Sequence, residues 1–148
     1  MYTIITDSCC DLNPQVAASL KEFEILPLSY TIGGVTCTES LVGDAAKAYY
    51  DRLRAGEACT TSQINPDEFY RAYMAHIEKG EQLLCLHFSS ALSGTYSSAC
   101  IARDMILEER PDAVIEIVDT LAASAGQGMM VCVAAENREK GMTLQENA

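Results

Sequence analysis

The 148-residue sequence predicts an α/β domain in three layers, with a mainly parallel sheet between helices and one added β-hairpin. Short apolar or β-branched runs alternate along the chain with segments whose apolar residues recur every three to four positions. Residues 83–88 are nearly all apolar, as in a strand covered on both faces. Gly33 and Gly34 separate two strand-like segments, which is the signal for a tight hairpin.

The first predicted elements are a strand and a short helix. The β-branched run 3–6 stops at Asp7, as a buried strand does. Asn13 is a helix-capping residue and Pro14 suits the first helical position. A helix is therefore expected from Pro14 to about Leu20.

The hairpin and a second helix follow. Residues 24–32 indicate a strand that Pro27 interrupts, and residues 35–38 supply the second hairpin strand. We expect this hairpin as an addition at the edge or rim of the parallel sheet. Asp44 is expected to cap a helix that runs to Arg54.

The next helix carries the strongest start signal in the sequence. Asn65 and Pro66 predict its first residues, and Glu68 completes a capping-box spacing with Asn65. Apolar residues follow at intervals of four from Phe69, and Gly80 ends the helix. The remaining predicted elements are the strand 83–88, a helix at 93–109, a strand at 114–118 and a helix at 123–140.

A second capping-box spacing joins Thr143 to Glu146. It predicts that a new helix begins where the sequence stops. We therefore expect the 148 residues to be one domain of a longer chain.

Charge and composition narrow the classes of function. Lys and Arg number 10 and Asp and Glu number 21, which gives a formal net charge of −11. Such a surface repels phosphate backbones, so no nucleic-acid partner is expected. No apolar stretch approaches the ~20 residues that a membrane span needs. The N-terminus lacks the basic region of a secretory signal, and we expect a cytoplasmic protein.

Metal, cofactor and redox chemistry are not indicated. The seven cysteines are odd in number and lack the C-x-x-C spacing of zinc or thioredoxin-like sites. The adjacent Cys9 and Cys10 are interpreted as two reduced thiols in a loop. Two histidines are too few for a metal site, and we expect no metal and no cofactor.

Small polar residues follow the predicted strands 3–6, 83–88 and 114–118. In parallel α/β sheets, ligands bind at the carboxyl ends of the strands. These ends are expected to share one rim, and the polar residues there are Asp7, Ser8, Ser89, Ser90, Thr95 and Asp119. A further polar cluster, residues 60–63, precedes a predicted helix.

The segment 89–95 is the most informative of these ends. Its four hydroxyl side chains surround Gly94, just before the start of a predicted helix. Unpaired N–H groups and the positive end of the helix dipole favour an anion there, and Gly94 lets a ligand approach the backbone. The alternative is an ordinary serine N-cap with spare hydroxyls.

Several catalytic motifs are missing. There is no P-loop, no G-x-G-x-x-G after a strand and no G-x-S-x-G elbow. The segment 126–128 (Gly-Gln-Gly) is better explained by close helix packing. A triad of Ser93, His87 and Asp119 has no support from spacing.

The motifs resemble those of the DegV family, in the family's order and roughly its spacing. The matching segments are Ile5-Thr6-Asp7-Ser8 with Asp11-Leu12, Leu26-Pro27-Leu28, Thr61-Ser62-Gln63 with Pro66 and Phe69, Ser89 to Tyr96 with Ser98-Ala99, and Val118-Asp119-Thr120 with Ser124. Two departures are mild: Asn13 precedes the expected proline, and Thr120 stands where the family often has serine. Family members are nearly twice as long, and their second α/β domain, which closes the acyl pocket, is absent from this sequence.

The resemblance implies a carrier and not an enzyme. Family members hold one long-chain fatty acid, and some present its carboxylate to an ATP-dependent kinase subunit that makes acyl phosphate. By position, Thr61 and Ser93 match the residues that bind the carboxylate, and we assign Ser62 and Gly94 to the same site. The rim residues Asp7, Ser8, Ser89, Ser90, Thr95 and Asp119 are expected around the pocket.

Two other functions stay open at this point. The pattern of residues 90–95 (Ser-Ala-Leu-Ser-Gly-Thr) is also similar to loops that bind phosphosugars or phosphate. A serine hydrolase is the third hypothesis. A lipid carrier needs a long apolar pocket, whereas a phosphosugar site needs a short polar one.

Overall fold

The computed structural model describes residues 2–38, 41 and 43–148, and this part of the chain contains two sheets. The strands of the first sheet are β1 (Tyr2–Asp7), β2 (Phe23–Leu26), β6 (Gln82–His87) and β7 (Ile115–Asp119). They are all parallel, in the order β2-β1-β6-β7. The strands of the second sheet are β3 (Ser29–Ile32), β4 (Val35–Cys37) and β5 (Cys59–Ser62). They are antiparallel, in the order β4-β3-β5.

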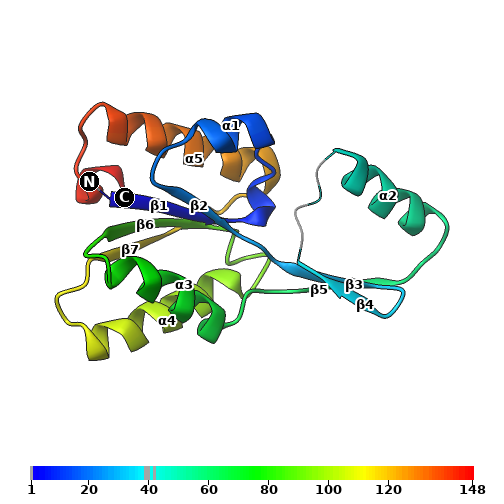
Figure 1. The fold of residues 1–148 in the computed structure, drawn as a ribbon, viewed down its shortest axis with the longest axis horizontal. Helices are drawn as coiled ribbons and strands as arrows, with labels where there is room; N and C mark the ends of the chain where they lie inside the picture. The colour runs from blue at the N-terminus through cyan, green and yellow to red at the C-terminus, as the bar shows by residue number, and fades with distance from the viewer. Residues whose placement is uncertain (1, 39–40, 42) are drawn as a thin grey trace.

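Helices cover both faces of the parallel sheet (Figure 1). The helical segments are η1 (Ser8–Cys10, a single 3₁₀ turn), α1 (Pro14–Ser19), α2 (Gly43–Arg54), α3 (Pro66–Ile77), α4 (Thr95–Glu109), α5 (Ser124–Glu139) and α6 (Leu144–Asn147). Helices α3 and α4 lie against one face, and α1, α5 and α6 lie against the other. The predicted three-layer α/β fold with a parallel sheet is confirmed.

The core follows from the alternation of side chains along each strand. Successive residues of a strand point to opposite faces, so Ile5 packs with Phe69 of α3 while Ile4 packs with Val131 of α5. Because helices cover both faces, both sets must be apolar. Every described residue of β1 is buried, which is why its sequence shows no polar alternation.

The predicted hairpin is present as an addition to the parallel sheet, and it belongs to a separate antiparallel sheet. Residues 24–32 form two strands, because Pro27 lacks the N–H needed to continue a sheet and the chain passes there from β2 to β3. Strand β3 pairs with β4 and also with β5, which the sequence did not predict as a strand. Strand β5 is polar and exposed for most of its length, so it has no apolar pattern to reveal it.

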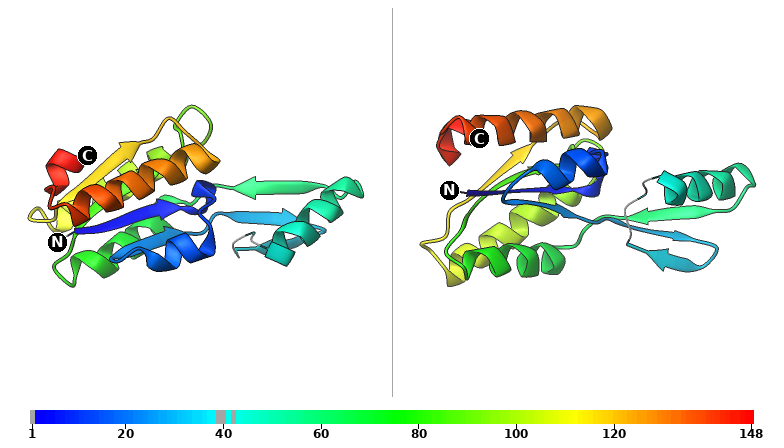
Figure 2. Two further views of the ribbon diagram at one scale, coloured as in Figure 1. Left: turned by 90° about the horizontal axis from the view of Figure 1, so that it is seen from above. Right: turned by 45° about the horizontal axis from the view of Figure 1, so that its top comes forward.

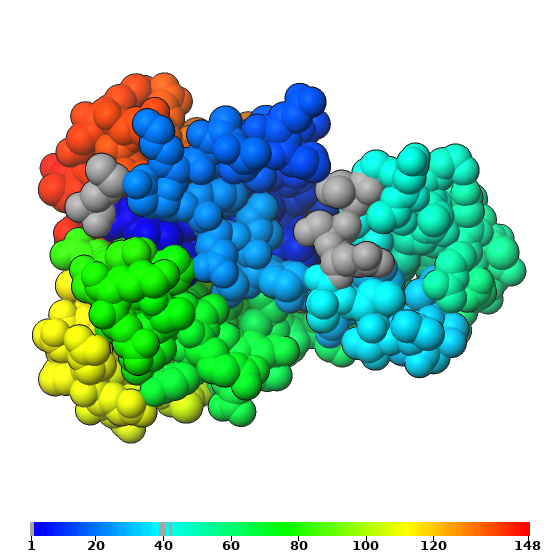
Figure 3. All heavy atoms as spheres, viewed as in Figure 1, coloured from blue at the N-terminus to red at the C-terminus, as the bar shows by residue number. Residues whose placement is uncertain are grey.

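The antiparallel sheet and α2 form a projection that we call the arm (residues 29–38, 41 and 43–62). Figures 2 and 3 show the arm extending from one end of the three-layer body. Asp44, predicted to cap α2, is instead its second residue, where its charge still complements the positive end of the helix.

The remaining helix starts lie close to their predicted positions. The capping box of α3 is formed, because Asn65 Oδ1 accepts from Glu68 N–H and Glu68 Oε2 accepts from Asn65 N–H. The capping box of Thr143 and Glu146 opens α6 as predicted. Helix α4 begins at Thr95, after the predicted position 93, with Gly94 as its N-cap residue.

Candidate functional site

The three predicted strand ends share one edge of the parallel sheet, as expected. The pairing aligns Thr6 of β1 with Leu86 of β6, and His87 of β6 with Asp119 of β7. The loops beyond these ends are tied together, because Ser90 N–H donates to Asp119 Oδ1 at 3.1 Å. The carboxyl edge is therefore a continuous surface built from β1, β6 and β7.

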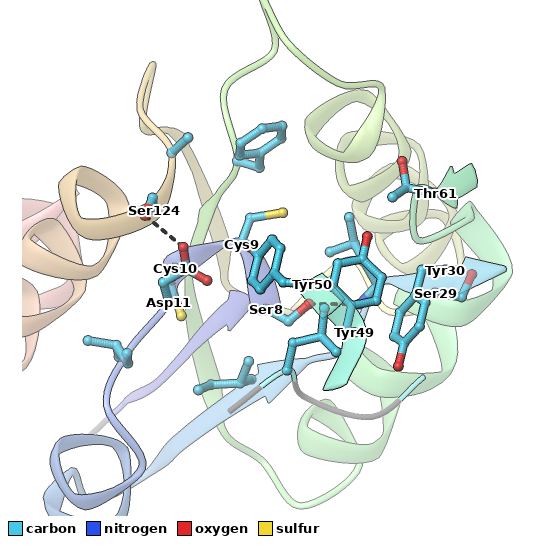
Figure 4. A pocket seen from close by; sticks show the side chains of 16 residues that line it. Ser8, Cys9, Cys10, Asp11, Ser29, Tyr30, Tyr49, Tyr50, Thr61 and Ser124 are labelled. Atoms are coloured by element: carbon cyan, nitrogen blue, oxygen red, sulfur yellow. Dashed lines mark hydrogen bonds between the residues drawn. The ribbon is translucent and has the colours of Figure 1, made fainter. Parts of the chain in front are cut away.

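A cavity of about 340 Å³ lies between this edge and the arm (Figure 4). Its lining is mostly apolar, and its volume is at the lower end for a small-molecule site. The body side consists of the turn 8–12 together with Ile25, Leu28, Phe88, Ala123 and Ser124. The arm side includes aromatic residues and Thr61.

Three tyrosines form the aromatic part of the arm side. The ring centroid of Tyr49 lies 5.0 Å from that of Tyr30 and 5.2 Å from that of Tyr50, both edge to face. The Tyr49 hydroxyl lies 3.3 Å from Cys59 Sγ, and this contact, aided by burial, raises the pKa of Tyr49 to about 12. Sequence reasoning missed this wall; the adjacent tyrosines in the predicted helix 44–54 were the available signal.

The turn 8–12 is attached at both sides. Ser8 Oγ accepts a hydrogen bond from Leu28 N–H at 3.0 Å, which fixes the start of the arm. Ser124 Oγ donates to Asp11 Oδ2 at 2.6 Å, so the first residue of α5 holds the other side. Both Asp11 and Ser124 adopt positive φ angles, of 46° and 53°. The predicted rim residue Ser8 lines the cavity.

The adjacent cysteines also line the cavity and are free thiols, as predicted. Burial raises the pKa of Cys9 to about 12, and the charges of Asp7 and Asp11 add to the effect. Burial also raises the pKa of Cys10. Because the thiolate is the reactive form, both side chains are poor nucleophiles near neutral pH.

The four residues assigned to the carboxylate occupy two segments. Thr61 is exposed on β5 and lines the cavity, whereas Ser62 beside it is exposed but outside the lining. Ser93 lies outside the lining as well, with its Oγ 3.0 Å from Thr95 Oγ1 and accepting from Thr95 N–H. Gly94, as the N-cap residue of α4, has no side chain to accept from the first turn of the helix.

Gln63 joins these two segments. Its Nε2 donates to Ser98 Oγ of α4 at 3.0 Å. Its side chain also covers Gly94, because a Cβ at that position would lie only 2.2 Å from Gln63 Oε1. The end of the strand that carries Thr61 is thus held against the loop that carries Ser93.

Most other polar residues of the rim hold the loops together. Ser89 is buried, with its N–H bonded to Ala122 O and its Oγ accepting from Ala91 N–H. Thr95 is also buried. Asp119 accepts from the N–H groups of Ser90 and Leu121; these bonds outweigh burial, and its pKa is lowered.

Asp7 is fully buried beneath the cavity. Burial alone raises its pKa, but hydrogen bonds from His87, Phe88 N–H and Gln127 more than compensate, and the net pKa lies below its ordinary value. Asp7 also accepts from Cys9 N–H and so caps the turn η1. The carboxylate acts on the cavity through these neighbours and is not itself exposed to it.

The catalytic triad considered above is not assembled. His87 Nδ1 lies 3.1 Å from Asp7 Oδ2 and its Nε2 lies 2.6 Å from the Tyr73 hydroxyl, so both ring nitrogens are occupied. Ser93 contacts Thr95 instead. Among the described residues, no group of three or more His, Cys, Asp or Glu is placed to hold a metal ion. None of the helices described is long and apolar enough to cross a membrane.

Known proteins share both the sequence and the fold. A family model for an uncharacterised protein of the DegV family matches residues 1–148. A DegV domain-containing protein of Streptococcus pyogenes serotype M1 is 43% identical over 148 residues, which cover 98% of this chain and 51% of that protein. This chain therefore spans about half the length of the curated relatives that it matches.

Two solved structures illustrate the shared fold. A DegV family protein from Thermus thermophilus, described by its fatty acid binding, matches with a TM-score of 0.83 and 35% identity over 99% of this chain and 50% of that one. The Fatty Acid Kinase B3 protein of Streptococcus pneumoniae, loaded with linoleic acid, matches with a TM-score of 0.82 and 23% identity over 99% of this chain and 51% of that one. The second match bears on the fold alone.

Proposed function

Because the chain belongs to the DegV family, we propose that it binds a long-chain fatty acid at the cavity between the body and the arm. The tail lies against the apolar lining, and the carboxylate lies near Thr61 and Ser93. The observation that carries this proposal is the lining itself, which is mostly apolar and includes the hydroxyl of Thr61 on the arm side. The Thermus thermophilus relative, described by its fatty acid binding, supports the same ligand class.

Burial of the tail supplies the affinity. A palmitoyl tail has about 14 methylenes, and at about 0.8 kcal/mol each their transfer from water is worth on the order of 11 kcal/mol before losses. The carboxylate loses hydration that neutral donors can restore, at about 1.5–3 kcal/mol for each hydrogen bond to the charged group. The hydroxyls of Thr61, Ser62 and Ser93 and the N–H groups beside Gly94 are the donors that we assign to it.

The charge of Asp11 indicates which end of the cavity holds the fatty-acid carboxylate. Asp11 and Thr61 lie on opposite sides of the cavity lining in Figure 4. A carboxylate near Asp11 would meet a like charge, whereas Thr61 offers a neutral donor. The head group is therefore assigned to the Thr61 side and the tail to the remaining lining.

The kinase step rests on the family resemblance. We propose that the protein is a carrier in the cytoplasm and that a separate ATP-dependent kinase subunit acts on the bound ligand. In that reaction a carboxylate oxygen attacks the γ-phosphorus of ATP, the bond to the bridging oxygen breaks, and acyl phosphate and ADP leave. A second domain, implied by the same resemblance, would close the rest of the acyl pocket.

Mass spectrometry of lipids extracted from the purified full-length protein tests the ligand. We expect long-chain fatty acids at a stoichiometry near one, and calorimetry with palmitate should then show saturable binding to the delipidated protein. The phosphosugar hypothesis predicts the opposite pattern, with binding of glucose 6-phosphate or inorganic phosphate and none of palmitate. That pattern would overturn the proposal.

A further inference from the structure

We propose that Asp7 is the positioning residue of the cavity, because its buried carboxylate holds two separate segments of the body-side wall in place. The segments are the turn 8–12 and the residue Phe88. The link to ligand binding rests on the function proposed above. The positioning itself rests on the contacts that follow.

Each oxygen of Asp7 serves one wall segment and one internal support. Oδ1 accepts from Cys9 N–H and from Gln127 Nε2, both at 3.1 Å. Oδ2 accepts from Phe88 N–H at 2.9 Å and from His87 Nδ1 at 3.1 Å. Charge-assisted bonds of this kind are about twice as strong as neutral ones.

The two backbone bonds reach the cavity directly. Cys9 and Phe88 both line it, and so do Ser8 and Cys10 on either side of Cys9. These wall segments are far apart in the sequence and come from different strand ends. A displacement of one carboxylate would therefore move both.

The internal supports keep the carboxylate from moving. The ring of His87 contacts Asp7 through Nδ1 and the hydroxyl of Tyr73 through Nε2. Tyr73 belongs to α3 and is fully buried. Gln127 of α5 is also fully buried, and its Nε2 bonds both Asp7 and Thr6. Its Oε1 finds no partner among the described residues, although an unpaired buried acceptor is costly. The amide orientation is thus set by the need to donate to Asp7.

Only a carboxylate suits this position. All the partners described for Asp7 donate, and an ionised carboxylate only accepts. An asparagine would place its NH₂ group where one carboxylate oxygen of Asp7 accepts from two donors. The hydrogen bonds from those two donors would then be lost. Asp7 itself is inaccessible to a ligand. Loss of its negative charge alone would favour a carboxylate ligand, so weaker palmitate binding by a variant that lacks this charge must come from the wall.

Asp7→Asn in the full-length protein tests the proposal, with Glu81→Gln as the matched control. Glu81 is also a carboxylate paired with a histidine, since its Oε2 lies 2.8 Å from His76 Nδ1 and accepts from Thr3 Oγ1. It lies at the opposite edge of the sheet, immediately before β6. Both variants lose a carboxylate–histidine contact, but only Asp7→Asn loosens the wall.

Two properties are measured: palmitate affinity for the folded fraction and the alkylation rate of Cys9 by iodoacetamide, assigned by fragment-ion mass spectrometry. The alkylation rate is followed across pH and expressed per Cys9 thiolate, because loss of the Asp7 charge alone increases the thiolate fraction. We expect Asp7→Asn to weaken palmitate binding by about tenfold or more and to speed Cys9 alkylation by a similar factor. Glu81→Gln should change each by less than about twofold. Equal changes in the two variants, or no change of either property in Asp7→Asn, would overturn the proposal.

The unmodified protein provides a measurement that needs no variant to fold. The amides of Cys9 and Phe88 should exchange with solvent at least about tenfold more slowly than that of Ser90, which donates to the less buried Asp119. Similar rates at the three amides would contradict the positioning role. Alkylation and exchange require no ligand. If palmitate fails to bind the native protein, the proposed function is wrong, but these two measurements still test the positioning role of Asp7.

Discussion

The side chain of Gln63 lies so close over Gly94 that a Cβ at position 94 would be 2.2 Å from its Oε1. Gln63 follows β5 directly and also donates to Ser98 of α4. One exposed glutamine therefore determines how the arm meets the loop that we assign to the fatty-acid carboxylate. The absence of a side chain at position 94 makes this contact possible.

Gly94→Ala should separate binding from stability. The φ of Gly94 is −74°, which alanine adopts easily, and Gln63 is exposed and can move away. We expect unfolding free energy to change by less than about 0.5 kcal/mol, while palmitate affinity falls by about three- to tenfold. Gln63→Ala should reproduce the loss of affinity. If Gly94→Ala binds palmitate normally, the contact has no role in binding.

Thr61→Ala and Ser93→Ala test the carboxylate assignment. Each removes one hydroxyl donor, and we expect each to weaken palmitate binding by about 10- to 150-fold. The control double variant Thr60→Ala, Ser97→Ala removes a neighbouring hydroxyl from the same strand and another from α4, both outside the cavity lining. If the hydroxyls merely cap or support their segments, melting temperature falls and affinity per folded molecule stays unchanged.

Gly128→Ala should destabilise the protein, whereas Gly126→Ala should not. A Cβ on Gly128 would lie 2.5 Å from the backbone oxygen of Cys10, which cannot move without shifting the turn. A Cβ on Gly126 would make an ordinary contact at 3.4 Å with Ala122. We expect a loss of about 1–3 kcal/mol for the first variant and a gain of up to about 1 kcal/mol for the second, read by urea denaturation.

The stabilising effect of Asp7 should be lost in acid. Its pKa is lower in the folded protein than its ordinary value, so its stabilising effect is complete above about pH 4 and is lost as the pH falls through the folded pKa. Asp7→Asn should be less stable than the native protein at neutral pH by about 3 kcal/mol or more. Denaturation measured from pH 7 to pH 2 should show that the difference in unfolding free energy between the native protein and Asp7→Asn becomes smaller below about pH 4. A constant difference would contradict the assigned direction.

The 148 residues alone should bind fatty acid more weakly than the full-length protein. If a second domain supplies the rest of the pocket, its loss leaves apolar lining in contact with water. Calorimetry with palmitate on both chains provides the comparison. Equal affinities would mean that these residues contain the whole acyl site.

Sequence patterns predicted the elements whose signals are local. The capping box of Asn65 and Glu68 depends on four consecutive residues, and the predicted and observed helix starts agree. Strand β5 was missed because Thr60 and Thr61 form a strand only by pairing with β3. No local pattern indicates the contacts of His76, whose ring nitrogens lie 2.6 Å from Glu24 and 2.8 Å from Glu81, because other segments contribute both carboxylates.

The candidate site also contains parts that local sequence patterns predicted and parts that they did not. The polar strand ends were visible in the sequence because each follows an apolar run. The aromatic wall was not, because Tyr30 and Tyr49 meet only when α2 folds back over the antiparallel sheet. Nor could any local pattern indicate that His87 would bond Asp7 of another strand.

The position of β1 between β2 and β6 means that β1 is synthesised long before one of its two partner strands. Tyr2 is aligned with Gln82, so one edge of this buried strand waits for roughly 80 further residues to be made. At typical elongation rates that interval is roughly 4 to 16 s. During it, the nascent chain exposes an unpaired apolar strand, which is a template for unwanted pairing. The native order of the sheet thus leaves one edge of β1 without its partner until β6 has been synthesised.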